Sequence, residues 1–313
     1  MRLLVSRALP DSVMAAAREA FEVTLRDTTR PMDLAECRAA LREHDVVLPT
    51  LGDAFRAEAF TGEIRAKGLA NFGVGMNHID VAAARAAGLV VTNTPGAVTD
   101  ATADIALTLI LMAARRAGEG ERLVRSGAWE GWHPVQMLGL HVTGKTLGVI
   151  GMGRIGQAVA RRCRLGFGME VVFHNRSAKD VEGARQLGSV AEVCATADVV
   201  VVAAPATPET HHIVDADALA AMRPHSILVN VARGDLVDEA ALIAALEARA
   251  IGGAGLDVYE HEPEVPERLR ALDNVVLLPH LGTAALEVRE AMGRMALDNA
   301  RAIAQGRAPP NPV

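Results

Sequence analysis

The stretch LGVIGMGRIGQAVARR, residues 147–162, limits the possible folds of this chain more than any other segment. Its apolar start, which ends at Ile150, predicts a buried strand. Gly151, Gly153 and Gly156 follow in G-x-G-x-x-G spacing, directly before a helical pattern rich in alanine. In that arrangement the first glycine permits a tight turn, the second lets a pyrophosphate approach the backbone, and the third allows close helix–strand packing. The stretch therefore predicts a dinucleotide-binding turn.

Glycines with this spacing also occur in turns that bind no nucleotide, so the surrounding sequence must decide. Downstream of the turn, apolar runs alternate with helical patterns, which is typical of a parallel, doubly wound sheet with helices on both faces. This alternation favours a cofactor-binding domain over a plain turn. The expected strands are Glu170–His174, Asp198–Ala204, Ser226–Ala232, Gly253–Val258 and Asn274–Pro279.

A second, smaller alternation of the same kind occupies residues 1–91 and predicts a separate α/β unit. The length of 313 residues allows two domains, each with its own core. We also expect one long helix from Val98 to Arg125. In the smaller unit the expected strands are Leu3–Val5, Val46–Leu48 and Leu69–Phe72, and the expected helices are Asp11–Ala20, Asp33–Arg42 and Val81–Ala87.

Composition argues against several classes of partner. The formal net charge is −6 and no basic block occurs, which argues against nucleic acid or an anionic membrane. The three cysteines are too scattered for a disulfide framework, and no C-x-x-C motif or Cys/His cluster predicts a metal site. The first residues resemble no secretory signal, and the apolar run Ile105–Ala114 is shorter than the roughly 20 residues that a bilayer span needs. We therefore expect a cytoplasmic protein that binds no metal.

The end of the strand after the glycine turn bears on the choice between NAD and NADP. Folds that select NAD usually place Asp or Glu there, to accept a hydrogen bond from the ribose 2′-hydroxyl. This chain instead has Asn175, followed by Arg176 and Ser177, all of which can donate hydrogen bonds to a 2′-phosphate. The segment predicts a preference for NADPH, with NADH possible. The alternative is that Arg176 is an ordinary solvated residue.

Three residues near expected strand ends fit the reduction of a 2-keto acid. That reaction needs a proton donor, a cation that holds and polarises the substrate, and a carboxylate that keeps the donor protonated. His280, Arg233 and Glu262 can supply these roles in turn. An arginine at the end of a central strand is costly unless it is paired, so we expect a ligand anion beside it. Each residue by itself has an ordinary explanation that is as good as the catalytic one. Glu262 could form a surface salt bridge, and His280 could lie in the core, bonded to backbone groups.

The segment NFGVGMNHID, Asn71–Asp80, interrupts a strand pattern with two glycines. The backbone N–H groups around Val74 and Gly75 could then point into a cleft, an arrangement that suits a carboxylate. A plain glycine turn explains this segment equally well.

Several motifs, in order over most of the chain, resemble those of the D-isomer-specific 2-hydroxyacid dehydrogenases. The resemblance implies a Rossmann-type dinucleotide-binding domain over residues 94–281 and a flavodoxin-like substrate domain over residues 1–93 and 282–313. It also implies that Arg233 binds and polarises the substrate, that His280 is the general acid/base, and that Glu262 orients His280. The motifs are GVGMNHID, NTPGAVTDATADIAL, GKTLGVIGMGRIGQAVARR, NVARGDLVDEAAL, GLDVYEHEP and LPHLG.

The resemblance assigns further ligand contacts. Backbone N–H groups near Val74 and Gly75 would hold the substrate carboxylate, Leu51 would border the substrate side chain, and Asp257 would meet the nicotinamide carboxamide. Asn77 replaces a frequent aspartate in the first motif, and we expect little effect on the chemistry. The other cofactor contacts that it implies are Thr102, Gly151, Gly153, Arg154, Ile155, Gly156, Asn175, Arg176, Ser177, Pro205, Thr210, Val231, Ala232 and Gly282.

The loop Ser126–Gly139 contains the pattern W-x-x-W-x-P, formed by Trp129, Trp132 and Pro134, which is similar to the glyoxylate/hydroxypyruvate reductase branch. Two tryptophans in a loop are more typical of packing or subunit anchors than of substrate contacts. The resemblance implies an NADPH-preferring reductase of glyoxylate and hydroxypyruvate that forms D-2-hydroxy acids, and a homodimer with this loop near the partner's active site. Alternatives are a bulkier 2-keto acid, phosphite or the use of NADH. A dinucleotide-sensing corepressor is a remote alternative, disfavoured by the intact triad and the acidic charge.

Overall fold

The computed structural model describes residues 1–313, which divide into two compact units. Unit 1 comprises Met1–Val98 and Thr283–Val313, and unit 2 comprises Thr99–Gly282. The chain therefore crosses between the units twice. The sequence patterns place the crossings at residues 93–94 and 281–282, whereas the structure divides at residues 98–99 and 282–283. None of the helices combines the length and the apolar composition that crossing a membrane requires.

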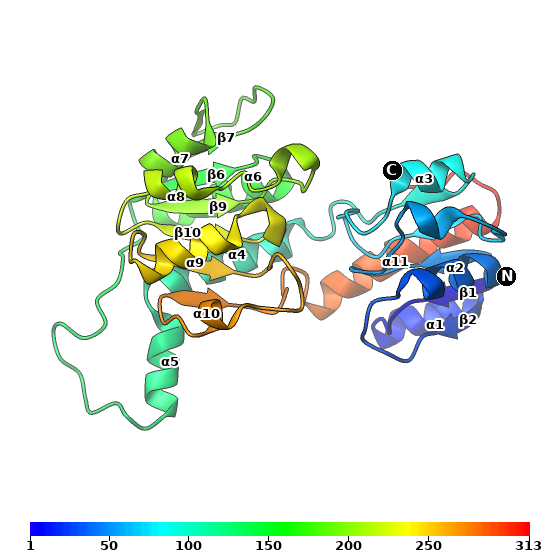
Figure 1. Cartoon of the computed structure of the whole chain (residues 1–313), viewed down its shortest axis with the longest axis horizontal. Coiled ribbons are helices and arrows are strands. Elements are labelled where there is room, and N and C mark those ends of the chain that lie inside the picture. The colour runs from blue at the N-terminus through cyan, green and yellow to red at the C-terminus, as the bar shows by residue number, and fades with distance from the viewer. The chain divides into compact units, whose positions relative to one another are not determined.

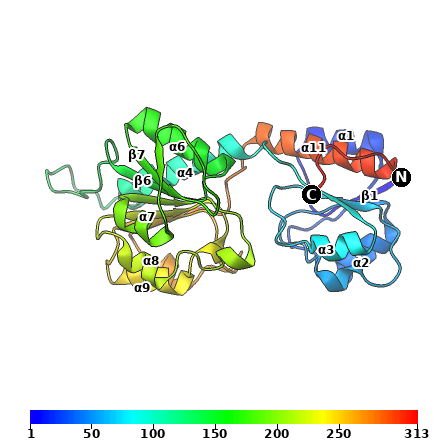
Figure 2. The same ribbon diagram turned by 90° about the horizontal axis from the view of Figure 1, so that it is seen from above.

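Unit 1 contains a five-stranded parallel sheet in the order β2-β1-β3-β4-β5, which is the flavodoxin-like order (Figure 1). Helices α1 and α11 cover one face of this sheet, and α2 and α3 cover the other (Figure 2). The predicted fold class of this unit is confirmed. Its elements are β1 (Arg2–Val5), α1 (Asp11–Ala20), β2 (Glu22–Leu25), α2 (Leu34–Glu43), β3 (Val46–Leu48), η1 (Ala57–Phe60), β4 (Gly68–Ala70), α3 (Val81–Ala86), β5 (Val90–Thr92) and α11 (Leu286–Ala304).

The alternation of side chains along a strand explains why the central strands of unit 1 are apolar throughout. Leu3 and Val5 of β1 lie in the core beneath α1 and α11, whereas Leu4 lies in the core beneath α2 and α3. Successive residues of a strand point to opposite faces, so a strand covered on both faces must be apolar at every position.

Unit 2 contains a seven-stranded parallel sheet in the order β12-β11-β10-β9-β6-β7-β8. Helices α4 and α6 cover one face, and α7, α8 and α9 cover the other (Figure 2). This arrangement confirms the predicted Rossmann-type, doubly wound sheet. The elements are α4 (Thr99–Ala114), α5 (Ala117–Arg125), β6 (Thr146–Ile150), α6 (Arg154–Phe167), β7 (Glu170–His174), β8 (Ala184–Gln186), α7 (Val190–Thr196), β9 (Val199–Val202), η2 (Pro208–Thr210), α8 (Ala216–Ala221), β10 (Ile227–Asn230), η3 (Gly234–Leu236), α9 (Glu239–Glu247), β11 (Gly253–Leu256), α10 (Glu267–Arg270) and β12 (Val275–Leu277).

The strand order of unit 2 reverses between β6 and β9. Both strands are buried, and the four consecutive valines of β9 contribute alternately to the cores on its two faces. The loops that follow β6 and β9 turn toward opposite faces at such a point, which leaves a crevice at the carboxyl ends of the strands. A doubly wound sheet binds its ligand at this edge.

The predicted single helix from Val98 to Arg125 is wrong, because the structure has two helices there. Helix α4 ends at Ala114, whose carbonyl accepts a hydrogen bond from the amide of Leu140 (2.7 Å). Arg116 then adopts a left-handed conformation with φ of +52°. A distant segment therefore ends the helix, although the local residues are good helix formers.

A glycine in α11 gives a test of the packing in unit 1, and an exposed glycine in α6 of unit 2 serves as its control. A Cβ added to Gly293 of α11 would lie 2.6 Å and 2.7 Å from the two Cγ atoms of Val13 in α1, whereas one added to Gly166 of α6 would meet nothing. We expect Gly293→Ala to lower the free energy of unfolding by about 1–3 kcal/mol through overpacking. Gly166→Ala, the matched control, should raise it by about 0.5–1 kcal/mol. Urea denaturation measures both, and a stabilised Gly293→Ala variant would contradict the close approach of α1 and α11.

Candidate active site

Adjacent strands of unit 2 bring the three predicted catalytic residues to one edge of the sheet. Strands β10, β11 and β12 are neighbours and run parallel. Arg233, Glu262 and His280 each follow the end of one of these strands, in that order. The sheet topology thus assembles groups that lie far apart in the sequence.

His280 and Glu262 form a hydrogen-bonded pair. The ring Nδ1 of His280 lies 2.9 Å from Oε2 of Glu262, and the other carboxylate oxygen accepts a hydrogen bond from the amide of Tyr259 (3.1 Å). Burial by itself would raise the pKa of Glu262. The hydrogen bond and charge of His280, the Tyr259 amide and the charge of Arg233 outweigh burial and hold the pKa of this carboxyl below its usual value. An ionised Glu262 therefore fixes one ring nitrogen of His280 and leaves Nε2 for other partners.

The backbone at His280 is strained and is held in place by Asp257. His280 has φ of +56°, in the left-handed region that costs a non-glycine residue roughly 1–2 kcal/mol. The buried carboxylate of Asp257 accepts hydrogen bonds from the amides of the next two residues, Leu281 (2.6 Å) and Gly282 (2.8 Å). The hydroxyl of Thr102 donates to the carbonyl of Gly282 (3.2 Å). Asp257, Thr102 and Gly282, which were predicted as cofactor contacts, thus brace the segment after His280, the predicted general acid/base.

Asp257 accepts these hydrogen bonds although its charge is buried. Burial raises the pKa of its carboxyl, and the two amides and the charge of His280 oppose that shift. The two amides stabilise the charged carboxylate of Asp257 only while the segment after His280 keeps this conformation.

Arg233 lies in a turn that two residues missed by the sequence analysis help to form. The side chain of Asn230, at the end of β10, donates to the carbonyl of Arg233 (2.8 Å) and accepts from the amide of Ala232 (3.0 Å). A Cβ on Gly234 would lie 1.9 Å from the carbonyl carbon of Tyr259, so only glycine lets this turn pack against the turn that precedes Glu262. Burial lowers the pKa of Arg233, and the negative charges of Glu262 and Asp235 oppose this effect.

The glycine turn has the geometry that a dinucleotide requires. Gly151 has φ of +95°, and a Cβ there would lie 2.5 Å from the backbone of Ala204. A Cβ on Gly156 would lie 2.3 Å from the carbonyl oxygen of Gly151, whereas the space beside Gly153 is open. Helix α6 begins immediately after Gly153, and the first amides of a helix have no partners within it. The open surface and these amides, including those of the predicted contacts Arg154 and Ile155, fit a pyrophosphate.

The end of β7 presents polar groups beside this turn. The side-chain amide of Asn175 donates to the carbonyl (3.0 Å) and hydroxyl (3.1 Å) oxygens of Ser177, while Arg176 is exposed. The hydroxyl of Thr207 lowers the pKa of Glu209, and the charge of Arg176 lowers it further. Arg176 is therefore close enough to Glu209 for their charges to interact.

Lys179 was not predicted from the sequence, yet its ammonium group donates to the carbonyl of Met152 within the glycine turn (2.8 Å). This bond ties the segment after β7 to the turn after β6. A lysine a few residues after a strand end carries no signal in the sequence alone.

The remaining predicted cofactor residues lie on the loops after β9 and β10. The hydroxyl of Thr210 donates to the carbonyl of Pro205 (2.8 Å), which closes the loop after β9. Val231 is buried and Ala232 is half-buried in the turn that leads to Arg233. Both loops lie at the carboxyl edge, on neighbouring strands.

Unit 1 holds the predicted substrate contacts Val74 and Gly75. The carbonyl groups of Gly73 and Gly75 accept hydrogen bonds from the side-chain amide of Asn71 (3.1 and 3.2 Å), and that of Val74 accepts from Asn93 (3.1 Å). These bonds turn the carbonyl groups toward the protein, and the amides of Val74 and Gly75 form no hydrogen bond within the chain. The loop therefore has the form of an anion-binding nest.

Leu51, the other predicted substrate contact, lies in a turn that Arg7 supports. The guanidinium of Arg7 donates to the carbonyl of Leu51 (2.7 Å) and the hydroxyl of Thr50 (2.6 Å), and it pairs with the buried Asp53 (3.3 Å). Arg7 and Asn71 are therefore supporting residues that the sequence analysis did not identify.

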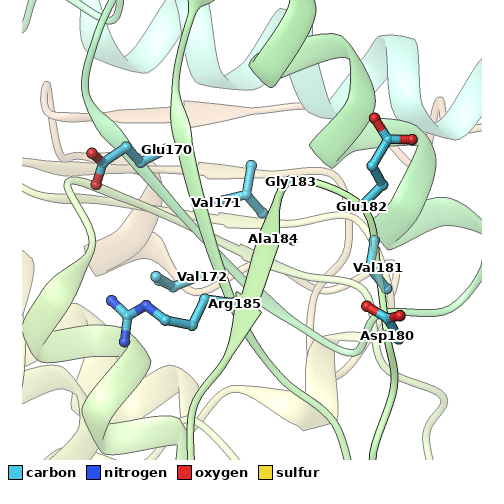
Figure 3. Close-up of a pocket in the computed structure, with 9 residues that line it drawn as sticks. All are labelled: Glu170, Val171, Val172, Asp180, Val181, Glu182, Gly183, Ala184 and Arg185. Atoms are coloured by element: carbon cyan, nitrogen blue, oxygen red, sulfur yellow. The ribbon is translucent and has the colours of Figure 1, made fainter.

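A separate pocket lies at the outer edge of the unit 2 sheet, between β7 and β8 (Figure 3). Its charged side chains do not gather at one point, since Glu170 and Arg185 extend to one side of the strands and Asp180 and Glu182 lie on the other. None of the predicted site residues lines it. A pocket without converging polar groups has no evident catalytic use. The lining residues are Glu170, Val171, Val172, Asp180, Val181, Glu182, Gly183, Ala184 and Arg185.

Comparisons with known proteins agree with this geometry. Residues 107–282 match the family model described as D-isomer specific 2-hydroxyacid dehydrogenase, NAD binding domain. The chain is 42% identical to a glyoxylate reductase of Thermococcus kodakarensis, over 100% of this chain and 96% of that protein. A solved structure of a protein from Thermus thermophilus is 44% identical, with a TM-score of 0.94 and full coverage of both chains. An NADPH-dependent glyoxylate/hydroxypyruvate reductase from Sinorhizobium meliloti, solved with NADP and malonate, is 36% identical, with a TM-score of 0.90 over 100% of this chain and 96% of that one.

The pair of His280 and Glu262 predicts a measurable change in a carboxyl pKa. In a His280→Ala variant, burial is no longer opposed by the hydrogen bond and charge of His280, so the pKa of Glu262 should rise. Carbon-13 NMR titration of the carboxyl groups measures this shift. Glu247, whose pKa is lowered by Arg268 in the same unit, is the internal control and should not change. An unchanged pKa of Glu262 in this variant would mean that the two side chains do not interact.

The sign of the associated stability change follows from the same pKa. Because folding lowers the pKa of Glu262, its contribution to stability is present above the pKa of the unfolded chain and is lost as the pH falls through the folded value.

Proposed function

We propose that this chain, which belongs to the D-isomer specific 2-hydroxyacid dehydrogenase family and is an NAD(P)-dependent enzyme of that class, reduces small 2-keto acids to D-2-hydroxy acids. Glyoxylate and hydroxypyruvate are the proposed substrates. The observation that carries the proposal is the pairing of His280 with an ionised Glu262 at the edge where Arg233 follows the neighbouring strand. This set of groups supplies a proton, a fixed negative charge and a cation.

In the proposed mechanism, His280 donates a proton from Nε2 to the substrate carbonyl oxygen. Glu262 stabilises the protonated ring through Nδ1 and keeps Nε2 directed away from itself. Arg233 binds the substrate and polarises its carbonyl group, because a guanidinium matches the geometry of oxygen anions. The bound nicotinamide supplies the hydride. The amides of Val74 and Gly75 are the proposed partners of the substrate carboxylate.

The proposal of glyoxylate and hydroxypyruvate is supported by the relatives. Proteins named glyoxylate reductase, such as the one from Thermococcus kodakarensis, match the chain over its whole length. The Sinorhizobium meliloti protein is named for both substrates. A bulkier 2-keto acid is the alternative, since selectivity among apolar side chains rests on differences of only about 1–3 kcal/mol.

We also propose that NADPH is preferred over NADH. No carboxylate follows β7 at the position that would repel a 2′-phosphate, and Asn175, Arg176 and Ser177 offer donors instead. The complex of the Sinorhizobium meliloti enzyme with NADP supports this choice.

We propose that the enzyme is a homodimer in which the loop at residues 126–139 contacts the partner. Figure 1 shows this loop extending away from the rest of unit 2. Trp129 is 50% exposed, and Trp132, Val135 and Leu138 are 68–79% exposed. Exposed apolar side chains grouped in this way mark interaction surfaces in soluble proteins.

The test of the proposed activity is the initial rate of glyoxylate-dependent oxidation of NADPH and, in parallel, of NADH. We expect turnover with both cofactors and a higher kcat/KM for NADPH. In His280→Ala, turnover should fall by about 10²-fold or more, while NADPH binding, followed by its fluorescence, should change little. Activity with larger 2-keto acids alone would replace the proposed substrates, and full turnover in the variant would contradict the proposed proton donor.

Arg176 provides a separate test of cofactor choice. Removing a charged hydrogen-bond donor costs about 1.5–3 kcal/mol, so Arg176→Ala should lower kcat/KM for NADPH by about 10-fold or more and leave the value for NADH almost unchanged. Arg185→Ala, at an exposed arginine on β8, is the matched control and should alter neither value. An equal fall in kcat/KM with NADPH and with NADH would show that Arg176 does not contact the 2′-phosphate.

A further inference from the structure

Two histidines and a glutamate meet at the carboxyl edge of unit 2, outside the groups that the proposed reaction uses. His211 and His212 follow the loop after β9, and Glu260 lies in the turn after β11. One side-chain ligand atom from each residue lies within 4.8 Å of those of the other two. Glu260 is 48 residues from His212 in the sequence, so the fold and not a local motif creates this group.

The backbone places the two histidine rings on one side of the chain. His212 has φ of +49°, and its amide donates to the carbonyl of Asp235 in the turn after β10 (2.8 Å). In an extended segment, consecutive side chains point to opposite faces. The left-handed residue removes that alternation, and the rings of His211 and His212 stack with centroids 3.9 Å apart. Strain of this kind concentrates at functional sites.

Carboxylates flank both nitrogens of His212. Its Nε2 lies 2.6 Å from Oε1 of Glu260, and its Nδ1 lies 3.9 Å from Oδ2 of Asp238. The amide of Glu260 in turn faces the carboxylate of Glu239 (3.4 Å). A histidine that binds a metal through one nitrogen usually directs its other N–H to a carboxylate. The carboxylate of Asp238 lies on the Nδ1 side of His212, and a small movement would bring it within hydrogen-bond distance.

We propose that His211, His212 and Glu260 bind a divalent transition metal ion, with Zn²⁺ as the expected occupant. Two imidazoles and one carboxylate are ligands that Zn²⁺ prefers, and three protein ligands leave a position for water. The ion takes the place of the proton that His212 and Glu260 share. Ligand bonds of about 2.0–2.2 Å require these side chains to move apart slightly. His211 is exposed and the other two are half-buried, so this adjustment needs no change in the core.

The bound ion would join the loop after β9 to the turn after β11. These segments lie on either side of the turn after β10, which carries Arg233. Anything that binds the folded state alone stabilises it by mass action. The ion therefore raises the thermal stability of unit 2, and this effect does not depend on the proposed reaction or its cofactor.

Isothermal titration calorimetry of the whole protein with Zn²⁺, in the absence of nucleotide, tests the proposal, together with the melting temperature. We expect one site, and a rise in Tm of roughly 5 °C at a hundredfold excess over Kd. An excess of Mg²⁺ should not displace the ion, because Mg²⁺ prefers oxygen ligands. Substituting Co²⁺ gives visible absorption bands whose intensity reports the coordination number of the bound ion. Absence of any binding of Zn²⁺ or Co²⁺ would overturn the proposal.

Variants locate the site. His211→Ala, His212→Asn and Glu260→Gln should each weaken binding by about 10-fold or more, and asparagine at position 212 retains a residue that tolerates the left-handed conformation. Asp238→Asn keeps the cap of α9 and should weaken binding by about 10-fold through His212 alone. His141→Ala, at an exposed histidine of the same unit, is the control and should have no effect. Binding that survives the three ligand variants but is lost in His280→Ala would place the ion at the catalytic pair and refute this site.

Discussion

The parallel pairing of the strands is the constraint on which the rest of unit 2 depends. Because every strand runs in the same direction, all of the loops that follow them emerge at one edge of the sheet. The central strands are apolar along most of their length and are buried on both faces, so they leave little room for polar side chains within the sheet. Polar chemistry is therefore confined to the edge, where Arg233, Glu262 and His280 stand after three adjacent strands.

At this edge, a few buried polar groups hold the turns after the strands in place. Asp257 binds the two amides after His280, and Asn230 binds both sides of the turn that ends in Arg233. Each side chain satisfies backbone groups that would otherwise be unpaired in a region with little water. The side chains proposed to be catalytic are thus positioned by backbone geometry, which only a few residue types at these positions can support.

The sequence predicted most of this arrangement because its signals are local. Glycine spacing, apolar strand runs and polar residues at strand ends all lie within a few positions of one another. The strands that were not predicted, β2, β5 and β8, all lie at edges of their sheets, where they are short and are buried less completely. The break between α4 and α5 was also missed, since it depends on Leu140, which approaches from outside the helix.

The supporting residues of the candidate site were missed for a similar reason. Lys179 and Arg7 act on the carbonyl groups of distant turns, and a sequence pattern does not reveal which turn a long side chain will reach. The group of His211, His212 and Glu260 is the clearest case, because its members come from loops after non-adjacent strands. Such groups can be recognised only when the fold is known.

The order of the elements along the chain has a consequence for biosynthesis. Unit 2 is one continuous segment, whereas the core of unit 1 is shared between its first strands and α11, which supplies Ala296, Leu297 and Ile303. A ribosome therefore releases all of unit 2 before it releases α11, one of the two helices that cover one face of the unit 1 sheet. Domains fold as units during synthesis. Unit 2 is consequently the first unit that can finish folding, and the N-terminal strands wait for the last helix with one apolar face covered only in part, by α1.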